Sequence, residues 1–156
     1  MPLRIMLDSM IYDEIVAKEG FSRLLEDVVK CGHVVILNTH IQDDQLSEIR
    51  KECKREAVAK VPGHKIPTSA AIWGVSKWDE ACWGDGAGDI KISDVQRGNP
   101  KHSEDALIAV TAASHADVLV THDTRFSSRV GATNSKLKVW NFQEFCSFIN
   151  SLPQVT

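Results

Sequence analysis

The stretch His102–Phe126, HSEDALIAVTAASHADVLVTHDTRF, decides the fold of this 156-residue chain. Ser103 is a good helix N-cap, and two acidic residues follow in the first turn, where the helix dipole favours negative charge. The almost wholly apolar body that follows, 106–113, predicts a helix covered on most sides. Val118–Thr121 is a short apolar run typical of a strand buried on both faces. The pattern therefore predicts one helix, one tight connection and one central strand.

An aspartate stands at each end of this unit. Asp105 shares a helix face with Ile108 and Ala112 by its spacing, so we expect it to be buried with them. An ionised carboxylate buried there needs a charge partner or a metal ion. Asp123 stands just past the carboxyl end of the predicted strand, which is the sheet edge where α/β proteins bind ligands.

The beginning of the chain repeats this arrangement, because the apolar run Leu3–Leu7 is followed directly by Asp8. Further apolar strands are expected at 33–37 and 137–140, and helices at 9–18, 21–30, 40–59 and 142–152. Such alternation predicts an α/β fold: a doubly wound parallel sheet of about four to five strands, with helices on both faces in three layers. Because no repeat, low-complexity tract or linker divides the sequence, we expect one domain over 1–156.

The helix expected over 40–59 carries two features of interest. Glu48 sits on the shoulder of its apolar stripe, and a basic ridge follows in the later turns, at Arg50, Lys51, Lys54 and Arg55. Either the ridge is a solvated face balanced by neighbouring glutamates, or it binds the phosphates of a nucleic acid.

The segment 61–99 is the hardest to interpret. Prolines and a glycine mark a loop over 61–67, and 69–83 is compatible with a helix. Three tryptophans fall in that helix, Trp73, Trp78 and Trp83. They either fill core grooves or form a dimer or partner surface.

Composition excludes several classes of protein. The net charge of −3 gives no general attraction to polyanions, so a nucleic-acid site has to be a local patch. No apolar run reaches membrane-spanning length, and the first residues lack the core of a signal peptide. The four cysteines are scattered without metal-ligand spacing, which indicates reduced thiols in a cytoplasmic protein and argues against zinc.

The acidic residues at strand ends point to a metal centre. Right-handed crossovers bring Asp8 and Asp123 to one sheet edge, where Glu48 could lean over and Asp105 would join if its buried face needs a charge partner. Carboxylates gathered together repel, and a divalent cation neutralises them. All-oxygen ligands favour Mg²⁺ or Mn²⁺, and such a site suits phosphodiester hydrolysis.

The strand ending in Asp8, the helix with Glu48, and the runs DALIA (105–109) and LVTHD (119–123) with Phe126 resemble the PIN-domain nucleases. The resemblance implies Mg²⁺- or Mn²⁺-dependent cleavage, usually of RNA. By matching motifs, it implies metal ligands at Asp8, Glu48, Asp105 and Asp123, with Thr121 orienting the site by hydrogen bonding. Many members of that family are toxins inhibited by a small antitoxin-like partner protein, and many are homodimers.

The chain also departs from the family pattern. Met10 stands where the family often has asparagine or serine, Arg125 stands where a further acidic residue often follows, and the segment before Ser103 is longer than in compact toxins.

Our leading hypothesis is a metal-dependent ribonuclease, with RNA contacts from Arg125, Lys101, Arg50 and Lys54. One rival is a PIN-like module that binds nucleic acid or protein without catalysis. A second is another Mg²⁺ phosphotransfer enzyme, which is weakened because the sequence has no phosphate-binding glycine loop and no D-x-D-x-T motif.

Overall fold

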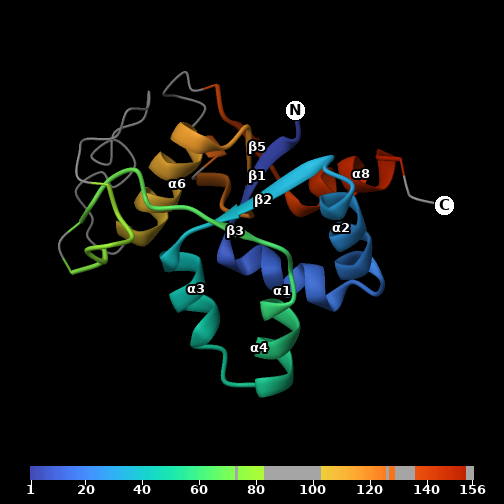
Figure 1. Cartoon of the computed structure of the whole chain (residues 1–156), viewed down its shortest axis with the longest axis horizontal. Helices are drawn as coiled ribbons and strands as arrows, with labels where there is room; N and C mark the ends of the chain where they lie inside the picture. The colour runs from blue at the N-terminus through green and yellow to red at the C-terminus, as the bar shows by residue number, and fades with distance from the viewer. Residues whose placement is uncertain (73, 83–102, 126, 129–135, 154–156) are drawn as a thin grey trace.

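The computed structural model describes residues 1–72, 74–82, 103–125, 127–128 and 136–153 (Figure 1). In chain order its elements are β1 (Leu3–Leu7), α1 (Ser9–Ala17), α2 (Phe21–Lys30), β2 (Val34–Asn38), α3 (His40–Ser47), α4 (Glu52–Ala59), β3 (His64–Lys65), α6 (Ser103–His115), β4 (Val118–Val120), β5 (Lys138–Trp140) and α8 (Phe142–Ser151). Among these helices, none has the length and apolar character needed to cross a bilayer.

The five strands form one sheet in the order β3-β2-β1-β4-β5, and every pair of neighbours is parallel. The chain adds strands outward from β1 in one direction and then returns to add β4 and β5 on the other side, so the sheet is doubly wound. This confirms the fold class predicted from the alternation of strands and helices.

Alternate residues of the strands face opposite layers of helices, as the two-residue period of a strand requires. Ile5 and Leu7 of β1 belong to a core cluster with residues of α1, α2, α4 and α8. Met6 belongs to the cluster on the other face, where α6 supplies more of the buried side chains than any other element. The three central strands are therefore apolar on both faces, and helices cover both sides (Figure 1).

The single helix expected over 40–59 is wrong, because α3 ends at Ser47 and α4 begins at Glu52. Both helices pack against the cluster that contains α1, through Leu46 of α3 and Val58 of α4, while Ile41 at the start of α3 belongs to the cluster with α6. The helix expected over 40–59 is therefore interrupted at 48–51. The expected basic ridge is broken with it, since two of its members lie between the helices, and Lys54 pairs with Asp13 at 2.8 Å.

The helix expected over 69–83 is also wrong within the described part of that range. Residues 69–72 and 74–82 form turns and irregular backbone, and Thr68 bridges to Ala81. Trp78 is 71% exposed, so it does not fill the core. Trp73 and Trp83 lie outside the described residues.

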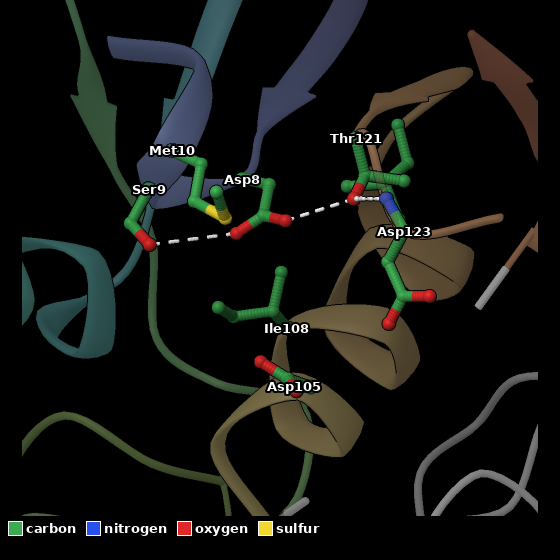
Figure 2. A pocket seen from close by; sticks show the side chains of 8 residues that line it. Asp8, Ser9, Met10, Asp105, Ile108, Thr121 and Asp123 are labelled. Carbon is green, nitrogen blue, oxygen red and sulfur yellow. Dashed lines mark hydrogen bonds between the residues drawn. The ribbon is translucent and has the colours of Figure 1, made fainter. Parts of the chain in front are cut away.

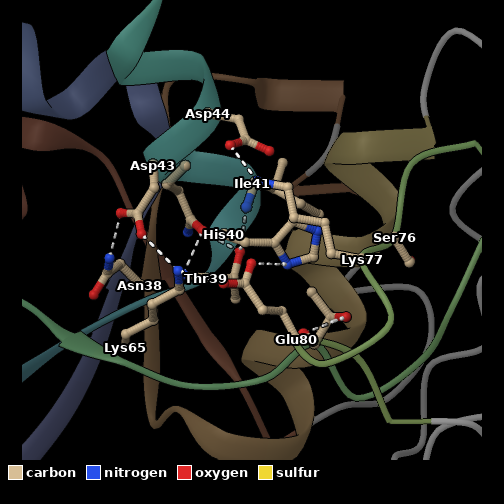
Figure 3. Close-up of polar contacts among 12 residues, drawn as sticks. Asn38, Thr39, His40, Ile41, Asp43, Asp44, Lys65, Ser76, Lys77 and Glu80 are labelled. Carbon is tan, nitrogen blue, oxygen red and sulfur yellow. Dashed lines mark hydrogen bonds and ion pairs between the residues drawn. The ribbon is translucent and has the colours of Figure 1, made fainter.

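Charged groups hold the segment 64–82 against α3 (Figure 3). Oε1 of Glu80 accepts a hydrogen bond from Lys65 at 2.9 Å. Oε2 of Glu80 lies 3.8 Å from Nδ1 of His40. His40 is 1% exposed, and neither ring nitrogen has a hydrogen-bond partner among the described residues. The hydrogen bond from Lys65, aided by the charges of Lys65, His40 and Lys77, lowers the pKa of Glu80. Glu80 therefore pairs with Lys65 and also faces the ring of a buried histidine.

We predict that Glu80→Gln lowers the free energy of unfolding by about 1 kcal/mol at pH 7, because it removes the carboxylate that pairs with Lys65 and faces buried His40. The folded-state pKa of Glu80 is lowered, so this contribution is present above its unfolded pKa of about 4.3 and is lost as the pH falls through the folded value. Urea unfolding between pH 3 and pH 7 measures the difference.

The matched control is Glu26→Gln, which also removes an acid paired with a lysine, but on the exposed surface of α2. We expect little change for this control. Equal losses in the two variants, or a loss in Glu80→Gln that persists at pH 3, would contradict the role given to Glu80.

Candidate functional site

Three of the predicted aspartates line one pocket at the carboxyl edge of the sheet (Figure 2). The pocket has a volume of about 150 Å³, several times the roughly 30 Å³ that a water molecule occupies. Its lining consists of Asp8, Ser9, Met10, Asp105, Ile108, Leu119, Thr121 and Asp123. We call it the acidic pocket.

Asp8 reaches the acidic pocket because β1 ends beside β4. Leu7 is in register with Val120, and the backbone N–H of Asp8 donates to the Val120 carbonyl at 3.0 Å. Asp8 is also the N-cap residue of α1, yet its side chain makes no capping hydrogen bond. An aspartate at that position ordinarily caps the helix with its carboxylate. Here the carboxylate is available to the pocket instead, so helix capping does not explain this residue.

Thr121 links two of the aspartates. Its hydroxyl donates to Oδ2 of Asp8 at 2.8 Å and accepts from the backbone N–H of Asp123 at 3.1 Å. The residue is 4% exposed, so this hydroxyl is held in a fixed position between the end of β1 and the loop after β4. Ser9 adds a longer contact, since its hydroxyl lies 3.4 Å from the other oxygen of Asp8.

Asp123 also has a local structural role. Its Oδ1 accepts from the backbone N–H of Arg125 at 2.9 Å, and its carbonyl accepts from Ser127 at 3.0 Å. These bonds start the short helical turn after β4. The same turn brings Arg125, which is exposed, next to the acidic pocket.

Asp105 lies in the first turn of α6 and is exposed, so the expectation that it is buried is wrong. Ile108, one turn later, is 3% exposed and packs under the sheet. The first turn of α6 instead borders the open pocket, where a carboxylate stays hydrated. Figure 2 shows Ile108 between Asp105 and Asp8 in the view drawn.

Glu48 is not among the residues that line the acidic pocket. It is the exposed C-cap of α3, at the end of that helix farther from the sheet edge. The α3 residues that reach the edge are Gln42, whose amide donates to the Leu7 carbonyl at 3.2 Å, and Gln45, whose amide donates to Glu104. Sequence reasoning missed these glutamines, although Thr39 and Gln42 have the spacing of a capping box.

The residues proposed to contact nucleic acid are spread out. Only Arg125 adjoins the acidic pocket; Arg50 lies exposed between α3 and α4, Lys54 is paired with Asp13, and Lys101 is outside the described residues. His122 points to α1, where its Nε2 pairs with Glu14. Among the residues that the structure describes, those lining the acidic pocket include neither histidine nor lysine.

Oxygen atoms are thus the only strong donors in the pocket lining, and this donor set suits Mg²⁺ or Mn²⁺. However, over the part of the chain that the structure describes, no three His, Cys, Asp or Glu side chains are grouped closely enough to hold a metal ion directly. The three aspartates surround the pocket without forming a compact ligand set.

Comparison of the sequence with protein-family models found no matching family, and comparison with curated proteins found no match.

We predict that Thr121→Val lowers the free energy of unfolding by about 1 kcal/mol, because it keeps the side-chain shape but removes the hydroxyl that donates to Asp8 and accepts from the Asp123 amide. It should also speed hydrogen exchange of the Asp123 amide, which loses its acceptor. Urea unfolding and amide exchange by NMR measure the two effects.

Thr111→Val is the control, because the buried Thr111 hydroxyl accepts from the Ser69 amide on the other side of α6. It should cost similar stability and leave exchange of the Asp123 amide unchanged after correction for global unfolding. The same exchange rate in both variants would show that Thr121 does not hold the loop after β4.

Proposed function

We propose that this protein is a metal-dependent ribonuclease of the PIN-domain type, which hydrolyses RNA phosphodiester bonds with Mg²⁺ or Mn²⁺. The observation that carries the proposal is that Asp8, Asp105 and Asp123, from distant parts of the chain, line one pocket together. Two of them follow neighbouring parallel strands, and the third begins a helix that runs back to the sheet.

A divalent cation gives a physical reason for this arrangement. Three carboxylates around one small pocket repel one another, and none of the described lining residues brings a positive charge. A bound Mg²⁺ or Mn²⁺ would offset that repulsion, activate water and stabilise charge on a phosphodiester in its transition state. Mg²⁺ is commonly held through several water molecules, which suits carboxylates that surround a pocket without forming a compact ligand set.

The protein's own residues would position the reactants. The Thr121 hydroxyl orients the Asp8 carboxylate through a 2.8 Å hydrogen bond and fixes the start of the loop that carries Asp123. Arg125, whose backbone N–H donates to Asp123, is the described basic residue that we propose contacts a phosphate of the RNA. Glu48 does not line the pocket, so it would act as a metal ligand only after a shift of α3 toward the pocket.

Further parts of the proposal concern the location of the protein and its partners. We propose a cytoplasmic protein, since the four free cysteines suit a reducing compartment. A role as the toxin of a toxin–antitoxin pair, inhibition by a small partner protein and a homodimer are proposed with it, and rest on the resemblance alone.

The rival proposal is a catalytically inert PIN-like module that binds nucleic acid or protein. It is favoured by the spread of the three aspartates and by the distance of Glu48 from the lining residues. The two proposals differ in whether the acidic pocket binds a divalent cation.

We predict that Asp8→Asn and Asp123→Asn each reduce cleavage of a labelled single-stranded RNA in Mn²⁺ by about 100-fold or more, since loss of even an indirect metal contact costs 10- to 100-fold. Asp27→Asn, on the exposed face of α2, is the matched control and should cleave normally. Undiminished cleavage by Asp123→Asn, or by the unaltered protein in excess chelator, would refute the assignment.

Thermal unfolding tests the rival directly. Mn²⁺ at a hundredfold excess over its Kd should stabilise the folded protein by about 2.7 kcal/mol, and so raise Tm by about 5–10 °C. The double variant with Asp8→Asn and Asp123→Asn should lose this rise, and Asp27→Asn should keep it. An unaltered Tm in Mn²⁺ would favour the inert module.

A further inference from the structure

A second groove lies along the edge strand β5, outside the acidic pocket. It has a volume of about 540 Å³, which falls within the roughly 300–1,000 Å³ of cavities that bind small ligands. Neither Asp8, Asp105 nor Asp123 lines it. The lining residues that matter here are Leu3, Arg4, Lys136, Lys138, Trp140 and Phe148. We call this cavity the β5 groove.

Cationic side chains border the β5 groove. Arg4 pairs with Asp117 at 3.1 Å, so these two lining residues add no net charge. Lys136 and Lys138 are exposed, and within the described part of the chain neither makes an ion pair. The described lining therefore carries an excess of positive charge, on a protein whose net charge is −3.

Aromatic side chains line the same groove. The ring centroids of Trp140 and Phe148 are 5.1 Å apart, and both residues are partly exposed. The smaller groove beside α4 offers a contrast, because its described lining includes Lys60 but no aromatic residue. Basic side chains beside accessible aromatic rings are the combination that binds single-stranded nucleic acid, since the cations contact phosphates and the rings stack on bases.

A ribonuclease built on this chain needs such a surface. The carboxylates of the acidic pocket repel phosphates, and much of the affinity of any protein for RNA comes from neutralising them. The β5 groove is close to the pocket, because Trp140 lies in register with Val120 and its carbonyl accepts from the Thr121 amide at 3.0 Å. The three residues of β5 span only about 10 Å. One single strand of RNA can therefore contact both places.

We propose that the β5 groove is a second RNA-binding site, in which Lys136 and Lys138 contact phosphates and Trp140 stacks on a base. The inference rests on the proposed ribonuclease function for the identity of the ligand, whereas the site itself is assigned from the residues of the groove. It anchors the RNA at a distance from the carboxylates, so it contributes to binding and not to cleavage of the bond.

The experiment measures binding of a labelled single-stranded RNA of about 16 nucleotides by fluorescence anisotropy, over a series of salt concentrations and in excess chelator. The variants are the double change Lys136→Gln with Lys138→Gln, and the single changes Trp140→Leu and Trp140→Phe. The matched control is Lys51→Gln with Lys60→Gln, which removes the same charge from exposed positions at the two ends of α4. Thermal unfolding checks that each variant is folded, and initial rates in Mn²⁺ give KM and kcat.

We expect the double change at Lys136 and Lys138 to weaken binding and to lower the slope of log Kd against log salt concentration by about 1.4, since each phosphate contact contributes about 0.7. Trp140→Leu should raise Kd about 5- to 100-fold, and Trp140→Phe should restore most of the affinity. The control should bind like the unaltered protein. In the cleavage assay the groove variants should raise KM and leave kcat unchanged.

Three results would overturn the groove as an RNA site. The first is an equal loss in the control, which would reduce the effect to general electrostatics. The second is an unchanged Kd in Trp140→Leu, which would leave a charged patch without stacking. The third is displacement of the RNA by an acidic peptide at equal charge concentration, which would indicate a protein partner instead.

The proposed nuclease fails or stands separately. Cleavage with a KM that the groove variants do not change removes the groove and leaves the ribonuclease standing. Binding that depends on Lys136, Lys138 and Trp140, without cleavage in Mn²⁺, keeps the groove and refutes the nuclease. Neither binding nor cleavage of RNA refutes both.

Discussion

In-register pairing of β1 with β4 is the constraint on which the acidic pocket depends. The two strands are distant in sequence, yet Leu7 lies opposite Val120, so the residues that follow each strand stand side by side. The Asp8 amide extends the ladder to the Val120 carbonyl, and the Thr121 hydroxyl then spans the remaining gap to the Asp8 carboxylate. A shift of one residue would turn every core side chain of β1 to the opposite face, so the packing of both layers maintains the alignment of the polar groups.

Much of this arrangement could be predicted from sequence because it depends on strong local signals. Apolar runs that end in an acidic residue identified β1 and β4 together with the aspartates that follow them, and the alternation with helices indicated a parallel sheet. The helix from Phe21 to Lys30 was predicted with its observed bounds, because its apolar stripe is regular and Gly20 and Gly32 flank it.

The errors arose where tertiary packing decides the outcome. Helical periodicity runs on through 48–51, but α3 ends at Ser47 and a second helix begins at Glu52, so Glu48 is left at the end of α3. Asp105 was placed near the site because a buried charge would need a partner, whereas it is exposed and reaches the pocket for a topological reason. A helix joined by a short turn to the next parallel strand runs antiparallel to it, so α6 begins at the carboxyl edge. The position of Asp105 at the carboxyl edge could therefore have been predicted from the order of the helix and the strand in the sequence.

The two edges of the sheet have a consequence for how copies of this protein could associate. β3 has two residues and β5 has three, so each offers few unpaired backbone groups to another chain. Both edges also carry a lysine, and Lys65 on β3 is engaged by Asp43 and Glu80. Short, charged edge strands are a common protection against edge-to-edge aggregation in natural β-sheets. At the two edges that the structure describes, self-association through a continuous intermolecular sheet is therefore disfavoured.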